Sequence, residues 1–243
     1  IGKYRDGDKL KHMTQVNLST MTIHTSLDTG GKVINLGKLQ QTFKKVKLSN
    51  GVVWEIHHSK TKNGEFFNQI TLGHRDHSKK KVKIFSNGTF HITGVINEAE
   101  CMAECVQAAK ILKGWGLVHF DEPKFEPLTI NLINTNYEIG FDINLTKIQK
   151  FFNGHQSIVE CRYEPEKYPG LNIKICVDKV KQRRVTILMF RSGNIMITGG
   201  KSYDDVLFAF SEINNIISSN YDTVFVNANV PKIKTKTIAC GYL

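Results

Sequence analysis

The chain carries an internal duplication at a constant offset of 105 residues. Residues 84–94 read Ile-Phe-Ser-Asn-Gly-Thr-Phe-His-Ile-Thr-Gly, and residues 189–199 read Met-Phe-Arg-Ser-Gly-Asn-Ile-Met-Ile-Thr-Gly. The phenylalanine, the turn glycine, one isoleucine and the closing Thr-Gly pair recur at matching places. Farther upstream, residues 34–43 and 143–152, which stand 109 residues apart, are identical at six of ten positions. A repeat of this kind predicts two similar half-domains related by a pseudo-twofold axis.

Both halves show the same predicted order of a strand, a short amphipathic helix, three strands and a long helix. We expect strands at 16–24, 66–73, 81–86 and 89–94, then at 128–135, 171–177, 183–191 and 194–199, with short helices at 35–46 and 144–153. Asn-Gly at 87–88 and Ser-Gly at 192–193 are typical of hairpin turns. We place the first repeat at 1–120 and the second repeat, with a C-terminal tail, at 121–243.

The long helix of each half has a marked start. Asn97 and Ser202 stand 105 residues apart and are suited to cap a helix, and an acidic residue follows each after three positions, at Glu100 and Asp205. One apolar stripe per helix is expected to face the core. The stripes are Met102, Val106, Ala109 and the stem of Lys113 in the first helix, and Val206, Phe210, Ile213 and Ile217 in the second.

The strand at 185–190 is apolar on both of its faces. Val185, Ile187 and Met189 point one way, and Thr186, Leu188 and Phe190 point the other way. In the next strand, Ile195 and Ile197 share one face, while Met196 and Thr198 share the other. Two helices per half supply enough material to cover one face of a sheet. We therefore predict that the uncovered face is a binding surface.

The composition indicates an anionic partner. The formal net charge is +11 and the sequence pI is about 9.4, a basic excess found in proteins that bind nucleic acid or anionic membranes. A generally basic solvated surface is the alternative. The five cysteines form no CxxC pair, which argues against a disulfide framework or a structural zinc site and favours a reducing, intracellular compartment. No apolar run approaches the roughly 20 residues of a membrane span.

Two motifs carry a resemblance to a known family. Residues 163–171 read Tyr-Glu-Pro-Glu-Lys-Tyr-Pro-Gly-Leu, and a hairpin motif is formed by Phe190, Ser192, Gly193, Thr198, Gly199 and Lys201. The first half keeps Phe85, Gly88, Thr93 and Gly94 at the corresponding places. Together with the duplication, these residues resemble the TATA-box-binding protein family over about 14–220. The long linkers resemble a divergent member of the kind carried by large DNA viruses.

The resemblance implies an α+β fold in which two repeats form a curved antiparallel saddle with the helices on its convex face. It implies a non-enzymatic general transcription initiation factor that needs no cofactor. Such a factor docks its concave sheet into the minor groove of A·T-rich promoter DNA and bends it; this family is the standard example of that mode of binding. The implied partners are a TFIIB-type factor and the RNA polymerase machinery. The implied place of action is the host nucleus or, for a viral protein, a cytoplasmic viral factory.

The resemblance also assigns roles to individual residues. The implied wedges between base pairs are Phe85, Phe190, Tyr168 and either Phe66 or Phe67. The implied base-edge contacts are Asn17, Asn131, Thr93 and Thr198, beside an apolar DNA face at Leu188 and Met196. Lys174, Arg191 and Lys201 are the implied phosphate neighbours, and Glu164 and Glu166 the implied contacts to the TFIIB-type partner. Because A·T and T·A present nearly the same minor-groove acceptors, such contacts favour A·T-rich sequence without reading its orientation.

Three departures leave other functions open. Lys83 and His91 stand on the open face where the family is apolar, although Val82 and Ile84 still point to the core, and Lys167 replaces an apolar residue in the partner-binding stretch. Lys83 and His91, together with Tyr168, which stands where the family's wedge is Phe, motivate one alternative: a scaffold of the same fold that recruits transcription proteins and binds DNA weakly or nonspecifically. A second alternative is an enzyme. It rests on His57-His58 and on His74 with His77, which lack the glutamate of an HExxH site and are weak signals.

Overall fold

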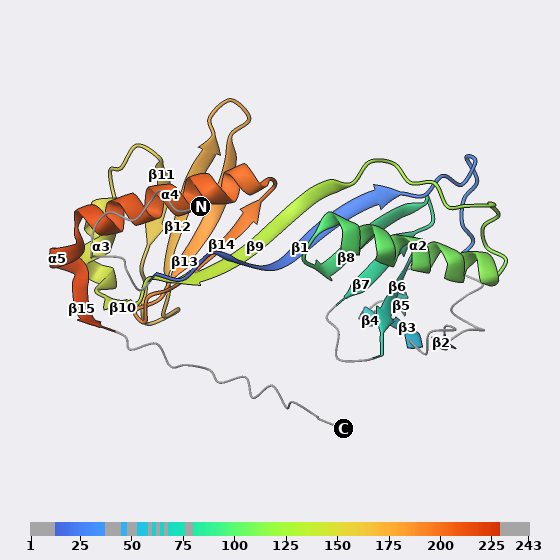
Figure 1. Ribbon diagram of the computed structural model, residues 1–243, viewed down its shortest axis with the longest axis horizontal. Coiled ribbons are helices and arrows are strands. Elements are labelled where there is room, and N and C mark those ends of the chain that lie inside the picture. The colour runs from blue at the N-terminus through green and yellow to red at the C-terminus, as the bar shows by residue number, and fades with distance from the viewer. Residues whose placement is uncertain are drawn as a thin grey trace, which may run out of the picture. The chain divides into compact units, whose positions relative to one another are not determined.

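The computed structural model describes residues 13–36, 45–47, 53–57, 60–61, 64–65, 68–75 and 80–228, and Figure 1 shows their path. The chain divides into two compact units. The first-repeat unit is made of Leu18–Thr135 and Thr198–Val206. The second-repeat unit is made of Asn136–Ile197 and the described parts of Ile1–Asn17 and Leu207–Leu243. Each unit thus combines segments that lie far apart in the sequence.

The first-repeat unit is a sheet with one long helix. Its strands follow the order β9-β1-β8-β7-β6-β3-β2, and the pairs from β1 to β2 are antiparallel. Helix α2 (Glu98–Gly114) packs on β7 and β8. The strands are β1 (Asn17–Ser26), β2 (Lys45–Lys47), β3 (Val53–His57), β6 (Gln69–His74), β7 (Lys81–Phe85), β8 (Thr89–Val95) and β9 (Thr129–Glu138), and β4 (Lys60–Thr61) pairs separately with β5 (Gly64–Glu65).

The second-repeat unit has the same plan with additions. Its sheet follows the order β11-β12-β13-β14-β9. The strands are β11 (Ile158–Arg162), β12 (Leu171–Asp178), β13 (Arg183–Met189) and β14 (Asn194–Gly200). The helices are α3 (Leu145–Phe152), α4 (Tyr203–Ser219) and α5 (Tyr221–Val224), and β10 (Phe141–Ile143) pairs with β15 (Phe225–Ala228). Figure 1 shows α2 and α4 each lying across the strands of a sheet.

Both helices cover only one face of their sheets. Val82, Ile84, Phe90 and Ile92 are buried in the first-repeat unit, as are Val185, Ile187, Met189, Ile195 and Ile197 in the second-repeat unit. The alternate residues of the same strands are half-buried or exposed. The predicted division of these strands into a core face and an open face is confirmed. No helix in the described ranges has the length and apolar character needed to span a membrane.

The duplication is visible at the level of single hydrogen bonds. Gly88 and Gly193 both have positive φ values, of +87° and +79°, which L-residues with a side chain rarely adopt. The Gly88 carbonyl accepts from Leu27 N–H at 2.9 Å, and the Gly193 carbonyl accepts from Ile139 N–H at 3.0 Å. The two hairpin turns therefore have the same conformation and the same type of neighbour.

The helix starts repeat in the same way. Asn97 Oδ1 accepts from Glu100 N–H at 2.7 Å, and Ser202 Oγ accepts from Asp205 N–H at 3.2 Å. The acids return a bond to the residue before the cap: Glu100 accepts from Ile96 N–H at 2.8 Å and Asp205 accepts from Lys201 N–H at 2.9 Å. The expected caps are confirmed, and the box closes one residue earlier than the standard form.

Three expectations about the elements were wrong. The helix expected at 35–46 does not reach its predicted end, because Lys45–Lys47 is strand β2; residues 37–44 lie outside the described residues. The core stripe predicted for α2 was wrong in part: Ala109 is buried as expected, but Met102, Val106 and Lys113 are not, and the buried residues beside it include Cys101, Cys105, Ala108 and Leu112. Strand β3 of the first repeat and strand β11 of the second, each preceding the three predicted strands, were not predicted.

Other elements match their predictions. Ile213 and Ile217 of the α4 stripe are completely buried, and Phe210 packs edge-on against the buried Tyr137 ring at 4.8 Å. The Tyr137 hydroxyl donates to Asn214 Oδ1 at 3.4 Å, and burial raises the pKa of Tyr137. Cys101 and Cys105 are buried free thiols, and the hydrogen bond with Cys101, followed by burial, raises the pKa of Cys105. They act as small apolar residues, as predicted.

The hairpin turn at Gly193 gives a test of this packing. A Cβ added at Gly193 would lie 2.2 Å from the Phe141 carbonyl oxygen, whereas a Cβ at Gly154 meets nothing within 4 Å, and both glycines have positive φ. We expect Gly154→Ala to cost about 1 kcal/mol from backbone strain alone, and Gly193→Ala to cost about 3 kcal/mol or more. Urea unfolding measures both, and equal losses would show that the close approach at Gly193 is absent.

Candidate nucleic-acid interface

The open face of the second-repeat unit is apolar, and none of the helices in the described ranges covers it. Thr186, Leu188 and Phe190 alternate along β13 and its end with the buried residues, and each is half-buried. Met196 on β14 is 39% exposed, although it is a large apolar side chain. Apolar residues that remain accessible on a sheet favour contact with another molecule over a role in the core.

An aromatic pair lies at one edge of this face. The rings of Tyr168 and Phe190 meet edge to face, with 6.0 Å between their centroids and an angle of 63°. Both rings pack against Gly170, where an added Cβ would lie 2.8 Å from Tyr168 Cε1 and 3.0 Å from Phe190 Cε1. The Tyr-Pro-Gly sequence thus makes room for the pair, and Tyr168 is 44% exposed. The two residues predicted as wedges in this repeat are brought together.

The open face of the first-repeat unit is polar. A row of side chains crosses four strands: Phe85 on β7, His91 on β8, His24 on β1 and Asn131 on β9. The Phe85 and His91 ring centroids are 5.1 Å apart, and those of His91 and His24 are 5.8 Å apart. His24 Nδ1 bonds Asn131 Oδ1 at 2.8 Å. Sequence analysis predicted Phe85, His91 and Asn131 on this face but missed His24.

The predicted base-edge residues do not all have the neighbours expected for them. The Thr198 hydroxyl donates to Asn134 Oδ1, and Asn131 bonds His24 instead. Thr93 is exposed and lies opposite Thr22 on β1, and Asn17 is exposed at the start of β1. Asn134 was not predicted as a site residue. Its signal in the sequence is the run Asn131-Leu-Ile-Asn134, which offers two candidate amides on one strand.

Phe66 and Phe67, the predicted second wedge of the first repeat, lie outside the described residues.

The predicted phosphate neighbours differ in their electrostatic surroundings. Lys174 Nζ bonds Glu160 Oε2 at 2.7 Å, and Arg162 Nε lies 2.5 Å from Glu160 Oε1. The hydrogen bond from Lys174, together with the charge of Arg162, holds the pKa of Glu160 below its usual value. Arg191 and Lys201 are both exposed, and within the described part of the chain no carboxylate pairs with either side chain. Of the three, Lys174 is already neutralised by a carboxylate.

The acidic loop after β11 is partly neutralised too. Lys167 Nζ lies 2.5 Å from Glu164 Oε2, and the Lys167 and Tyr168 backbone N–H groups both donate to the Glu164 carbonyl at 2.9 Å. Glu166 is exposed at the tip of this turn. The lysine that replaces an apolar residue in this stretch is therefore the ion-pair partner of one of the two predicted contact acids.

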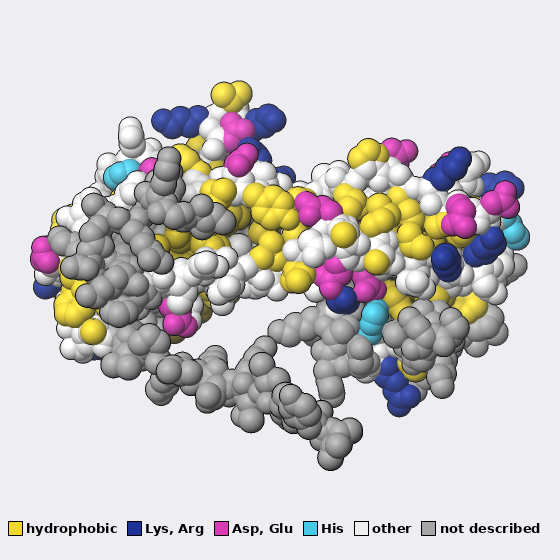
Figure 2. Space-filling view, in the orientation of Figure 1, with side chains coloured by type: hydrophobic (Ala, Val, Ile, Leu, Met, Phe, Trp, Pro, Cys, Tyr) yellow, Lys and Arg dark blue, Asp and Glu magenta, His cyan; other side chains and the backbone are white. Residues whose placement is uncertain are grey.

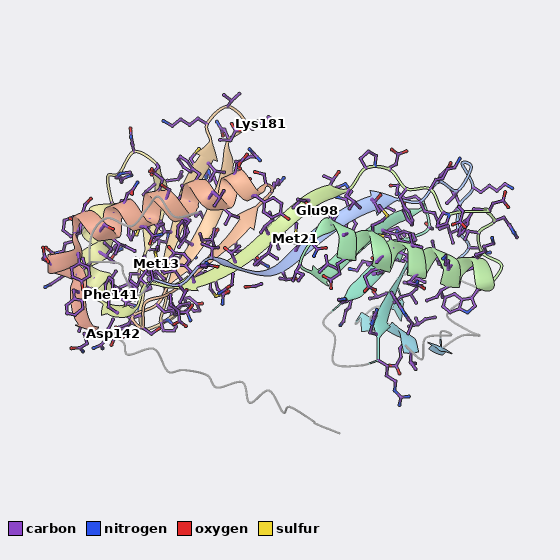
Figure 3. The ribbon with its side chains drawn as sticks, viewed as in Figure 1. Met13, Met21, Glu98, Phe141, Asp142 and Lys181 are labelled. Carbon is purple, nitrogen blue, oxygen red and sulfur yellow. The ribbon has the colours of Figure 1, made fainter. Side chains whose placement is uncertain are left out.

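Basic side chains also gather away from the open face. Figure 2 shows them over the turn between β12 and β13, where Figure 3 labels Lys181. Val180 at this turn is 93% exposed.

In the first-repeat unit, Figure 3 places Met21 and Glu98 near each other; the Tyr203 hydroxyl bonds Glu98 Oε2 at 3.2 Å and contacts Met21 Sδ at 3.8 Å.

The histidine motif considered for an enzyme has a structural partner. His74 Nε2 bonds Glu104 Oε2 at 2.9 Å, and the Trp54 ring stacks on His74 at 4.5 Å between centroids. Lys80 Nζ bridges Glu100 and Glu104 at 2.6 and 3.3 Å. Because Glu104 is buried, the Lys80 ammonium and the hydrogen bond with His74 compensate its burial. Within the described ranges, no group of three or more potential metal ligands occurs.

Comparisons with known proteins agree with this geometry. Residues 128–220 match the family described as "Transcription factor TFIID (or TATA-binding protein, TBP)". The TATA-box-binding protein-like protein of Acanthamoeba polyphaga mimivirus is 26% identical over 68% of this chain, which covers 50% of that relative's length. The TATA-box-binding protein of Archaeoglobus fulgidus is 32% identical over 56% of this chain and 68% of its own length.

A relative from Methanococcus maripaludis, also a TATA-box-binding protein, is 31% identical over 57% of this chain and 68% of its own length. Among solved structures, Methanococcus jannaschii TBP matches with a TM-score of 0.61 over 85% of this chain and 99% of that chain, at 20% sequence identity. The fold and the sequence therefore agree, and the chain belongs to the TATA-box-binding protein family.

Proposed function

We propose that this chain is a transcription initiation factor that docks the open face of its sheets into the minor groove of A·T-rich DNA and bends it. The observation that carries the proposal is the Tyr168–Phe190 pair, held over Gly170 at the edge of an uncovered apolar face. An aromatic side chain at such an edge can enter between two base pairs, and the apolar face behind it can cover the sugar edges of the opened groove. Phe85 is the corresponding wedge of the first repeat.

The basic excess supplies the salt-dependent part of the binding. A net charge of +11 attracts the phosphate backbone, and each phosphate that a cation neutralises releases bound counterions. This attraction contributes affinity without choosing a sequence. Sequence choice is left to the asparagine, threonine and apolar residues of the open face, which meet the base edges.

The proposal includes a protein partner. Glu166 and, when Lys167 releases it, Glu164 offer carboxylates to a TFIIB-type factor, which connects the DNA-bound protein to the RNA polymerase machinery. The protein would act wherever its promoters are transcribed, in a host nucleus or a cytoplasmic viral factory.

A scaffold that binds DNA weakly is the second candidate, and two observations favour it. Lys83 and His91 give the first-repeat unit a polar open face, and desolvating polar groups without partners is costly. Tyr168 also stands where the family's second wedge is a phenylalanine. The two functions differ in one property, because only the initiation factor bends DNA in a manner that depends on A·T content.

Removal of the wedges tests the proposal. We expect Phe85→Ala with Phe190→Ala to abolish most of the bending of an end-labelled A·T-rich duplex of about 20 base pairs, measured by fluorescence energy transfer, because each repeat then loses one of its two wedges. Binding at low salt should persist, since it rests on charge.

The matched control is Phe151→Ala. Phe151 is 38% exposed on helix α3 and is not on the open face, so its loss should leave the bending unchanged. Bending that survives in the double variant would refute the wedge assignment. If the wild-type chain binds A·T-rich and G·C-rich duplexes equally and shortens neither, the scaffold is the better description.

The cations can be separated by their salt dependence. Arg191→Gln should lower the slope of log K against log salt by about one, because it removes one phosphate contact. Lys174→Gln should change that slope less, since Glu160 already neutralises Lys174 in the free protein. Titration of fluorescent A·T-rich DNA at three or more salt concentrations measures both. A larger effect at Lys174 would mean that DNA displaces Glu160.

A further inference from the structure

The two repeats differ most at two positions of the open face. At the 105-residue offset, Lys83 corresponds to Leu188 and His91 corresponds to Met196, whereas Phe85 corresponds to Phe190 and remains aromatic. Lys83 lies directly opposite His91 in the β7–β8 register. The hairpin of one repeat thus presents a cation and an imidazole where the hairpin of the other presents two aliphatic side chains.

A hydrogen bond to Asn131 fixes the orientation of His24, the neighbour of His91 on the open face. Asn131 Oδ1 only accepts, so Nδ1 of His24 donates to it at 2.8 Å. His91 is directly opposite His24 across β1 and β8. Neither ring nitrogen of His91 has a hydrogen-bond partner within the described part of the chain, although the side chain is half-buried.

The surroundings also keep His91 neutral. Burial is the main cause that lowers the pKa of His91, and the adjacent His24 and Lys83 lower it further. The groups packed around the ring are Phe85 and Lys83 on β7 and His24 on β1, and none of them is an acid that would stabilise the imidazolium. At pH 7 the ring therefore offers one N–H donor and one acceptor nitrogen.

In the minor groove, the base pairs differ mainly by one hydrogen-bonding group. A·T and T·A present only acceptors, whereas G·C adds the donor N2 amino group of guanine. An apolar face leaves that amino group buried without an acceptor, which disfavours G·C. An imidazole acceptor can bond it, and the Lys83 ammonium can donate to the neighbouring acceptors that every base pair presents there.

We infer that the first-repeat hairpin, through His91 and Lys83, tolerates G·C pairs in the half-site that it covers, while the Leu188 and Met196 hairpin restricts the other half-site to A·T. The inference rests on the proposed minor-groove function and specifies its preferred DNA. The ligand is a duplex whose half-site under the Leu188 and Met196 hairpin holds A·T pairs, while the half-site under the His91 and Lys83 hairpin can hold G·C pairs. Since a uniform A·T site offers both repeats the same pattern, a mixed site would also fix the direction in which the protein lies on DNA.

Inosine provides the direct test, because an I·C pair lacks the N2 amino group and otherwise keeps the G·C hydrogen-bonding pattern. Three duplexes with the same A·T half are compared, whose other half holds A·T, G·C or I·C pairs. We expect wild-type protein to bind all three within about threefold. The repeat-swapped variant Lys83→Leu with His91→Met should bind the G·C duplex about tenfold or more weakly than the I·C duplex.

Controls separate this inference from the proposed function. The variant must keep its bending of the all-A·T duplex, which also shows that it is folded. The single variant His91→Met should carry most of the G·C discrimination, because the imidazole supplies the acceptor. The reverse swap, Leu188→Lys with Met196→His, should allow G·C pairs in both halves.

Two outcomes would overturn the inference while leaving the bending function intact. One is a wild-type protein that bends the all-A·T duplex but rejects G·C, relative to I·C, in either half. The other is a swapped variant that loses affinity equally for all three duplexes with a smaller salt slope, which would make Lys83 and His91 phosphate contacts only. A wild-type protein that bends none of the duplexes would refute the proposed function itself.

Discussion

The packing of one long helix on one face of a sheet is the constraint on which the rest of each unit depends. In the first-repeat unit, the buried face of α2 contains Cys101, Cys105 and Ala108, whose small side chains bring the helix close to Val82, Ile84, Phe90 and Ile92. Every strand residue of opposite parity is then left on a face that no helix covers. Because side chains on that second face do not pack in the core, their polarity can differ between the repeats without loss of the fold.

Because the sequence is duplicated, a long helix packs on one face of a sheet in both units. Turn geometry and helix caps satisfy backbone groups, and they are the parts that the two halves share most closely: Gly88 with Gly193, and Asn97 with Ser202. Side chains on the open face are not fixed by backbone hydrogen bonds. His91 and Met196 therefore occupy corresponding positions on the same scaffold and present opposite chemistry to a ligand.

Sequence reasoning located what depends on local pattern. Alternation along 185–190 identified the core and open faces, and the Asn-Gly and Ser-Gly dipeptides identified the hairpins, because both signals act within a few residues. Sequence reasoning failed where contacts between distant parts of the chain decide which residues are buried or paired. The α2 stripe was misplaced in part, since cysteine and alanine are weak hydrophobic signals. His24 and Asn134 were missed because their partners, Asn131 and Thr198, come from distant strands whose register the sequence does not state.

A polar group on a docking face can either weaken DNA binding or recognise a base pair. The contacts along the row Phe85, His91, His24 and Asn131 decide between these two outcomes. An isolated imidazole that loses water in a dry groove weakens binding. His91, however, is held between Phe85 and His24, and His24 is in turn fixed by Asn131. Side chains that are already ordered lose little conformational entropy when a ligand binds, and this favours recognition over simple repulsion. The side chains of this row make the first-repeat face more polar than the apolar face of the second repeat. The same side chains are also the ones best placed to select a base pair.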